Sequence, residues 1–218
     1  MKKEFQKKSV AKKEAPRKFR WKMILSVSVS VFIILISVFG IWFIATDGNI
    51  FRPQTHIIHY YPVNYAENIF DNQVYMSFER ELLYSNSKEE QPFDYETDYE
   101  SASEECKFFL DYFKTVIEGK YSEYPTFFMD DYFDEDPKFT MQMIYEPYVS
   151  YHSTGVETID SKETEVYNFY VRYRIFRNNG TFRTGVESNT AVPQIYQLIK
   201  IDETTYRIYR ILDINFES

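Results

Sequence analysis

The side chains in this sequence that could carry acid–base chemistry are few and lie far apart. His152 is the only histidine in the last two thirds of the chain, and Asp130 or Asp131 could act as a base. General acid–base catalysis needs such a group within hydrogen-bond reach of the reacting atoms and oriented by a partner. No partner stands at a recognisable spacing, so the sequence predicts a structural His152 and identifies no catalytic residue.

Two patterns of metal-ligating side chains also fall short of a site. His56 and His59 are spaced as a ligand pair, but no third ligand follows at a recognisable spacing. Residues 94–100, DYETDYE, alternate carboxylates but lack the turn glycine and closing glutamate of a calcium loop, and the acids of 130–136 lack them too. We expect neither a metal nor a cofactor.

Cys106 and Asn179 are the other residues with recognisable chemistry. Cys106 falls on the apolar side of a predicted helix, where a buried and unreactive thiol is expected. Asn179-Gly180-Thr181 matches a glycosylation acceptor, which matters only in a eukaryotic secretory pathway.

Charge and hydropathy divide the chain into parts that must lie in different surroundings. Residues 1–22 carry ten basic and two acidic side chains, whereas the rest of the chain carries 15 basic and 31 acidic ones. Residues 23–45 contain no charged side chain. Since a bilayer core about 30 Å thick requires roughly 20 apolar residues, we expect 23–45 to be a transmembrane helix, with Trp21 and Trp42 at its two interfaces.

The basic residues before the helix predict its orientation. By the positive-inside rule, 1–22 form a cytoplasmic tail and residues 46–218 lie outside the cell membrane. Cleavage by signal peptidase requires small residues after a short apolar core, but this run ends in the bulky Ile41-Trp42-Phe43-Ile44 before Ala45. An uncleaved, single-pass anchor is therefore expected.

Both the anchor and the tail suggest partners. Ser26, Ser30, Ser37 and Gly40 project within roughly 80° of one another on a helix, a stripe of small residues that would permit packing of a second helix. The tail could hold anionic lipid headgroups or nucleic acid, but it has no stacking platform or groove-binding motif. We expect the lipid bilayer as its partner and no nucleic acid.

The pattern of the segment 46–102 predicts a juxtamembrane segment and an acidic linker between the anchor and the domain that follows. Four-residue spacing of apolar side chains predicts one amphipathic helix within 64–85. From residue 88 to 105 the chain is almost entirely acidic and aromatic, which is typical of a solvated linker.

Residues 103–218 have the patterns of a compact domain. A capping box at Ser101 and Glu104 predicts the start of a helix that ends at Gly119. Shorter helical segments are expected at 124–133 and 138–145.

After Pro147 the hydrophobic period changes from 3.6 to 2. Clean alternation predicts a strand at 165–176, and Asn178-Asn179-Gly180 predicts a hairpin turn. The remaining strands are expected at 181–192, 194–201 and 204–211. Helices followed by an antiparallel sheet make an α+β domain.

Two parts of the domain resemble NTF2-like domains. VIEGKYSEYPTFFMDDYF (116–133) resembles the joint between their opening helices, and YQLIKIDETTYRIYRI (196–211) resembles their last hairpin. The resemblance implies a cone, in which helices cover a curved antiparallel sheet with a concave mouth. A basic tail, one anchor and such a domain are also similar to VirB8-type components of conjugation and type IV secretion machines.

In such a cone the mouth is where a ligand would bind. Residues that would line it are Tyr167, Tyr196, Tyr206, Tyr209 and His152, although tyrosines favour half-buried strand positions in any sheet. We expect a bacterial envelope protein that is no enzyme and whose outer domain contacts other envelope proteins or a second copy of itself. The alternatives are a ligand-binding or sensing domain that uses the cone, and an isomerase- or dehydratase-like enzyme.

Overall fold

The computed structural model describes residues 57–214, and the predicted tail, anchor and small-residue stripe lie outside them. No helix among the described residues has the length and apolar character needed to cross a bilayer. The described chain forms an α+β unit with one six-stranded sheet in the order β2-β1-β3-β4-β5-β6.

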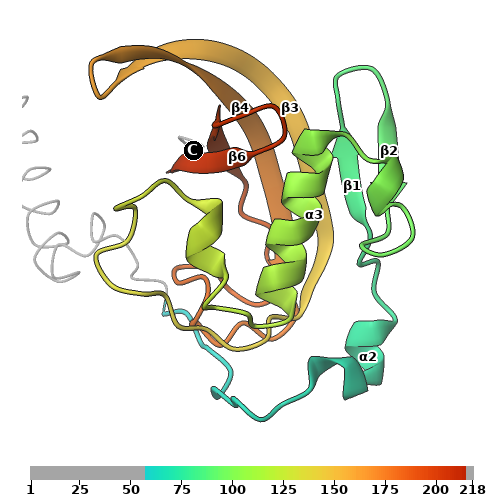
Figure 1. The fold of residues 1–218 in the computed structure, drawn as a ribbon. Coiled ribbons are helices and arrows are strands. Elements are labelled where there is room, and N and C mark those ends of the chain that lie inside the picture. The colour runs from blue at the N-terminus through green and yellow to red at the C-terminus, as the bar shows by residue number, and fades with distance from the viewer. Residues whose placement is uncertain (1–56, 215–218) are drawn as a thin grey trace, which may run out of the picture. The chain divides into compact units, whose positions relative to one another are not determined.

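The long helix α3 (Glu104–Ile117) lies inside the curve of the sheet (Figure 1). Nine of its fourteen residues are buried, among them Phe109, Tyr112 and Phe113. Ser103 is its N-cap and accepts a hydrogen bond from the Cys106 amide at 3.3 Å, so the predicted capping box at Ser101 is wrong. Gly119 ends the helix as predicted, with a φ of +67° that suits glycine.

The strands that follow α3 form an antiparallel meander. They are β3 (Ile144–Ile159), β4 (Lys162–Ile175), β5 (Gln194–Lys200) and β6 (Tyr206–Asp213). In Figure 1 the long β3 and β4 arch around the helix. The strands predicted at 165–176, 194–201 and 204–211 are confirmed.

Two strands from the expected juxtamembrane segment complete the sheet. β1 (Leu82–Ser85) and β2 (Glu90–Phe93) form a hairpin, and β1 pairs with β3 in parallel through Leu83 opposite Tyr148. The sheet is therefore mixed and not antiparallel throughout as predicted. The described part of 46–102 packs on residues 103–214 and does not stand apart as a linker.

The acidic stretch is ordered because its aromatic residues are buried and its acids bind their own backbone. Phe93 is buried in the core, and the Asp94 carboxylate accepts hydrogen bonds from the amides of Glu96 and Thr97 at 2.9 and 3.0 Å. These hydrogen bonds hold the pKa of Asp94 below its usual range. A 3-10 helix, η3 (Tyr99–Ser101), then leads into α3.

The helix predicted within 64–85 is wrong. Two very short helices, η2 (Ile69–Asp71) and α2 (Gln73–Met76), occupy its first half. Asn68 and Asn72 cap these helices with their side chains, which favours separate turns over one continuous helix. The Tyr75 hydroxyl then donates to the Ile144 carbonyl at 2.9 Å, which fastens this segment to the start of β3.

Two other predicted elements near the sheet are replaced by irregular chain. The segment 138–145 is extended and runs directly into β3, and η4 (Tyr124–Phe127) is the only helical turn within 124–133. Both segments place large side chains under the sheet, including Phe128 and Phe139, so burial overrides the helical spacing.

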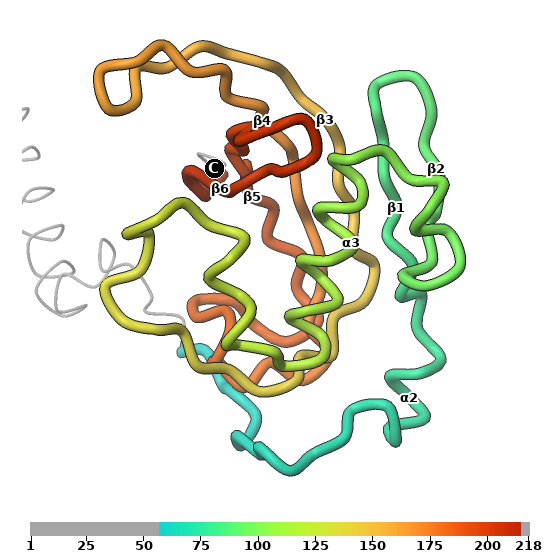
Figure 2. The backbone as a smooth tube through the Cα atoms, viewed as in Figure 1, coloured from blue at the N-terminus to red at the C-terminus, as the bar shows by residue number. Residues whose placement is uncertain are grey.

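The predicted hairpin at Asn178-Asn179-Gly180 is a broad loop with no strand at 181–192. The buried Asn178 amide donates to the carbonyls of Arg183 and Val186 at 3.0 and 2.8 Å, and these bonds take the place of a strand ladder. Residues 57–65 lie against this loop, where Tyr61 donates its amide to the Asn178 carbonyl at 2.9 Å (Figure 2).

Candidate functional site

The space between α3 and the sheet, where the cone would hold a ligand, is filled with aromatic rings. Phe109 packs on Phe169 at a ring-centre distance of 5.1 Å, and Phe113 packs on Tyr173 at 5.5 Å. Such edge-on contacts add about 0.5–1.5 kcal/mol each beyond the buried area. This region is therefore a packed core.

Three tyrosine hydroxyls meet in the middle of this core. The Tyr112 hydroxyl lies 3.1 Å from that of Tyr124 and 3.2 Å from that of Tyr196, so it joins α3 to η4 and to β5. Burial raises the pKa of all three side chains well above the ordinary value, which keeps them neutral. Tyr196, one of the residues predicted to line the mouth, thus lies in the packed core.

Tyr167 and Tyr206, two of the residues expected at the mouth, lie in contact with each other. Their rings meet edge to face with centres 5.8 Å apart. The Tyr206 hydroxyl donates to the Glu105 carboxylate at 2.7 Å, and the Tyr167 hydroxyl donates to that of Glu165 at 2.9 Å. Because both hydroxyls are bound to carboxylates of the chain, neither is a free catalytic group.

The other two predicted mouth residues lie elsewhere. Tyr209 is half-buried on β6 beside Arg210, which donates to its hydroxyl at 2.9 Å. His152 is exposed on β3 at an irregularity in the pairing with β4. The five residues therefore do not converge on one pocket.

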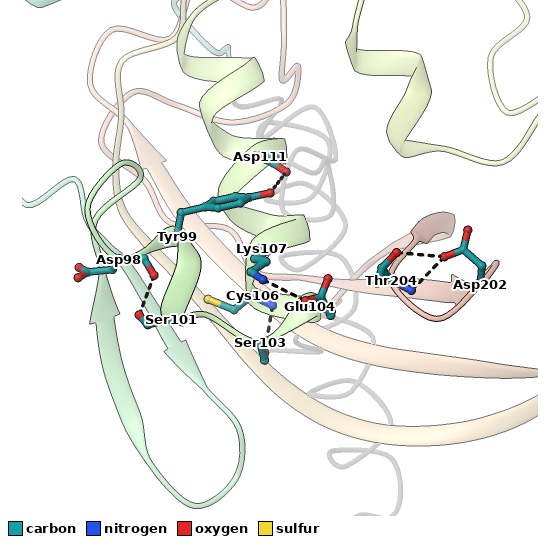
Figure 3. Close-up of polar contacts among 10 residues, drawn as sticks. All are labelled: Asp98, Tyr99, Ser101, Ser103, Glu104, Cys106, Lys107, Asp111, Asp202 and Thr204. Carbon is teal, nitrogen blue, oxygen red and sulfur yellow. Dashed lines mark hydrogen bonds and ion pairs between the residues drawn. The ribbon is translucent and has the colours of Figure 1, made fainter.

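A surface cavity of about 220 Å³ adjoins Tyr206 at the side of α3. Within it the Tyr99 hydroxyl donates to the Asp111 carboxylate at 2.8 Å, as Figure 3 shows. Burial raises the pKa of Asp111 above its usual value against the opposing effects of that hydrogen bond and of Lys114. Asp111 can therefore hold a proton more readily than an exposed aspartate, but its carboxylate already accepts the hydrogen bond from Tyr99.

Ion pairs account for the charged groups around this cavity. Lys107 pairs with Glu104 at 3.0 Å at the start of α3 (Figure 3). The pair lies on the surface, where such contacts contribute at most about 1 kcal/mol. The cavity is a paired polar surface and offers no unoccupied acid or base among the residues named here.

The remaining candidates from the sequence are distributed over the surface or buried singly. Asp130 is exposed and pairs with Arg207 at 2.6 Å, and Asp131 is exposed beside it. Cys106 is fully buried, and burial raises its pKa to about 12, which confirms the prediction of a buried thiol. His59 is exposed, whereas His56 lies outside the described residues. Within residues 57–214 no group of three or more potential metal ligands comes together.

The structure reveals one group that the sequence does not indicate. Arg80 and Tyr95, from opposite sides of the β1–β2 hairpin, line the same surface cavities near the end of α3. Neither belongs to a motif, and their separation in sequence follows no helix or strand period, so only their tertiary placement identifies them.

Models of protein families, curated proteins and solved structures contain no match to this chain.

Proposed function

We propose that this protein is a single-pass component of a bacterial envelope complex, with residues 46–218 outside the membrane as a protein-binding domain. The sequence supports the anchor through its uncharged residues 23–45, and the ten basic residues before them support a cytoplasmic N-terminus. The domain is proposed to be NTF2-like, which is supported by a long helix followed by a four-stranded meander that curves around it.

The observation that carries the proposal is a stretch of exposed apolar side chains at the start of the described chain. Of the thirteen large apolar side chains exposed in residues 57–214, eight fall between Ile57 and Met76. Tyr65 is 73% exposed and Val74 is 55% exposed. Exposed apolar side chains concentrated in one segment support a proposal that this segment contacts another protein or a membrane.

The arm formed by residues 152–165 offers a second surface. Beyond Ser150 in β3 and before Val166 in β4, these two strands pair only with each other among the described residues. Strand edges left open in this way can accept a strand from a partner. The arm carries four acidic side chains and one lysine, which favours a basic partner over pairing with a second arm.

The packed aromatic core favours a binding scaffold over the two alternatives. A ligand-binding cone or an isomerase-like enzyme requires an enclosed cavity with several polar groups aimed inward. Here rings of Phe109, Tyr112 and Tyr196 occupy the space beneath the sheet, and their polar atoms bind one another.

Cysteine labelling on intact cells tests the membrane topology. Ser9→Cys and Gly155→Cys would be made in a Cys106→Ser background, because Cys106 is the only native cysteine. A membrane-impermeant maleimide should label position 155 on intact cells and position 9 only after lysis. Labelling of position 9 on intact cells would refute the proposed orientation.

Site-specific photo-crosslinking tests the binding surfaces. A photoreactive amino acid at Tyr65 or at Val156 should give defined higher-mass adducts in cells, whereas the exposed position Ser122 serves as the control. Adducts at Ser122 equal to those at both test positions, or no adduct at either test position, would contradict an assembly role.

A further inference from the structure

Arg80 is a half-buried cation that makes no ion pair within 4 Å with a carboxylate of the described chain, although it lies near enough to Asp94 to help lower the pKa of that carboxyl. Its guanidinium carbon lies 5.7 Å from the centre of the Tyr75 ring, and its buried Nε has no hydrogen-bond partner. An arginine withdrawn from water normally has an anionic or carbonyl partner, because desolvating an unpaired charge is costly. Arg80 therefore keeps its capacity to bind an anion.

The Tyr95 hydroxyl is a second buried polar group without a partner. Burial raises the pKa of Tyr95 strongly, so this hydroxyl is a neutral donor. Arg80, Tyr95 and Asp94 together line two adjoining surface cavities of about 270 and 380 Å³. Unpaired buried donors are rare in folded proteins, and these two belong to residues that line the same cavities, so one acceptor entering there would satisfy both once the chain around them shifts.

The other charged groups of the smaller cavity already have partners within the chain. Glu96 lies 3.8 Å from Lys114, Glu118 lies 2.7 Å from Lys120, and Asp94 accepts backbone hydrogen bonds within its own turn. Of the two cations that line this cavity, Arg80 and Lys114, Arg80 is the one with no carboxylate within ion-pair distance, and three carboxylates line the cavity with them. These carboxylates would repel a dianion such as phosphate. They would not repel a zwitterion, in which a carboxylate and a positively charged group belong to the same molecule.

The walls of the smaller cavity add an apolar contact. Phe70 and Ile117 line it from η2 and from the last turn of α3. Its volume lies just below the range typical of sites for drug-sized ligands, so it suits a smaller molecule. An apolar side chain of a few carbon atoms fits this description.

We propose that this cavity binds a small zwitterion of the α-amino-acid type with an apolar side chain. Its carboxylate would accept hydrogen bonds from the Arg80 guanidinium, which matches a carboxylate in shape and charge. Its ammonium group would face Asp94, Glu96 and Glu118, and its side chain would rest on Phe70 and Ile117. The contact with the Tyr95 hydroxyl requires a small shift of the 94–97 turn, because that hydroxyl is now covered.

Calorimetric titration of the detergent-solubilised full chain tests the ligand class. The probes are L-leucine and L-phenylalanine. L-Leucinamide lacks only the carboxylate, 4-methylpentanoate lacks only the ammonium group, and inorganic phosphate serves as a control for binding of any anion. At least one amino acid should bind, and loss of its carboxylate charge should weaken binding about 10–100-fold, the effect of losing a charge-assisted hydrogen bond. No binding of either amino acid at millimolar concentration, or equal binding of leucine and its amide, would overturn the proposal.

Three variants locate the binding site. Arg80→Gln should abolish binding, and Tyr95→Phe should weaken it about 3–10-fold while leaving the unbound protein at least as stable, because the hydroxyl it removes is unpaired. Arg177→Gln is the matched control, since Arg177 also lies over a tyrosine ring, 5.8 Å from that of Tyr61, but at another cavity. If Arg80→Gln fails to fold, Tyr95→Phe decides the matter. Unchanged affinity in the folded Arg80 variant, or in Tyr95→Phe, would refute the assignment.

Discussion

The three hydroxyls in the core predict unequal effects of removing each one. The Tyr112 hydroxyl is hydrogen-bonded to the hydroxyls of both Tyr124 and Tyr196. Tyr112→Phe therefore breaks two buried hydrogen bonds, and the other two hydroxyls each lose Tyr112 as a partner. Tyr124→Phe breaks only one and leaves the bond between Tyr112 and Tyr196. A buried hydrogen bond contributes about 0.5–1.5 kcal/mol net, and an unsatisfied buried group costs about 1–3 kcal/mol.

We therefore expect Tyr112→Phe to lower the free energy of unfolding by about 2–4 kcal/mol and Tyr124→Phe by about 1 kcal/mol. At about 2–4 °C per kcal/mol for a domain of this size, the Tm should fall by roughly 4–16 °C for Tyr112→Phe and roughly 2–4 °C for Tyr124→Phe. Both changes keep the aromatic ring, so the packing of Tyr112 and Tyr124 on Phe128 is preserved. Tyr65→Phe, at an exposed position, should leave the Tm unchanged.

Near-ultraviolet circular dichroism of the solubilised full chain can follow this unfolding. The only tryptophans are Trp21 and Trp42 and every tyrosine lies at residue 60 or beyond, so the tyrosine bands report on the folded unit after residue 56. The decisive measurement is the double variant. Once Tyr112 has lost its hydroxyl, adding Tyr124→Phe should be neutral or stabilising, because that hydroxyl has lost its Tyr112 partner. Strictly additive losses would show that the hydroxyls do not form one network.

Three further outcomes follow from the same structure. Gly119→Ala should lower the Tm in thermal unfolding by several degrees, because the added Cβ would lie 2.6 Å from a backbone nitrogen at a residue with a φ of +67°. Gly155→Ala is the control and should leave the Tm unchanged, because there is open space around Gly155. Equal effects of the two substitutions would contradict this reasoning. Asp111→Asn should raise the Tm at pH 7. Because burial raises the pKa of Asp111, this group stabilises the fold below its ordinary pKa of 3.8, and the contribution is lost as the pH rises through its pKa in the folded protein. The gain in Tm from Asp111→Asn should therefore shrink towards pH 4. A gain that does not depend on pH would show that burial of the carboxylate is not its cause. Cys106, with its pKa raised to about 12 by burial, should react with a thiol reagent only after unfolding in urea, and rapid reaction of the folded chain would show that the thiol is accessible.

The elements that the sequence predicts correctly are those whose pattern lies within one continuous segment. Alternation of buried side chains identifies the strand at 165–176, and β4 ends within one residue of the prediction. The apolar face of α3 and its end at Gly119 follow from the 3.6-residue period and from the conformational freedom of glycine. These signals are local, and distant contacts do not override them.

The errors occur where the contacts of individual side chains, and not the composition of the segment, decide the conformation. Asn178-Asn179-Gly180 has the composition of a hairpin turn, but the amide of Asn178 is buried and binds two carbonyls of a broad loop. The acidic stretch 88–105 has the composition of a linker, but it contributes β2 and the buried Phe93. Composition describes the average behaviour of a segment in water and not the contacts that the rest of the chain provides for it.

The candidate site depends still more on tertiary structure. The sequence supplies tyrosines at strand spacing, but the sheet sends Tyr196 into a packed core and places Tyr167 and Tyr206 against carboxylates. Arg80 and Tyr95 come to line one cavity only because the β1–β2 hairpin folds back beside α3.

The sequence by itself determined the separation of charge along the chain, the uncharged stretch at 23–45, the long helix and three strands of the meander. Only the tertiary structure decided that β1 joins β3 in parallel, that the core beneath the sheet is filled, and that two unpaired donors share a cavity. The physical reason is range. Periodicity and charge are properties of neighbouring residues, whereas strand pairing and the pairing of buried polar groups depend on which distant segments meet once the chain has closed on itself.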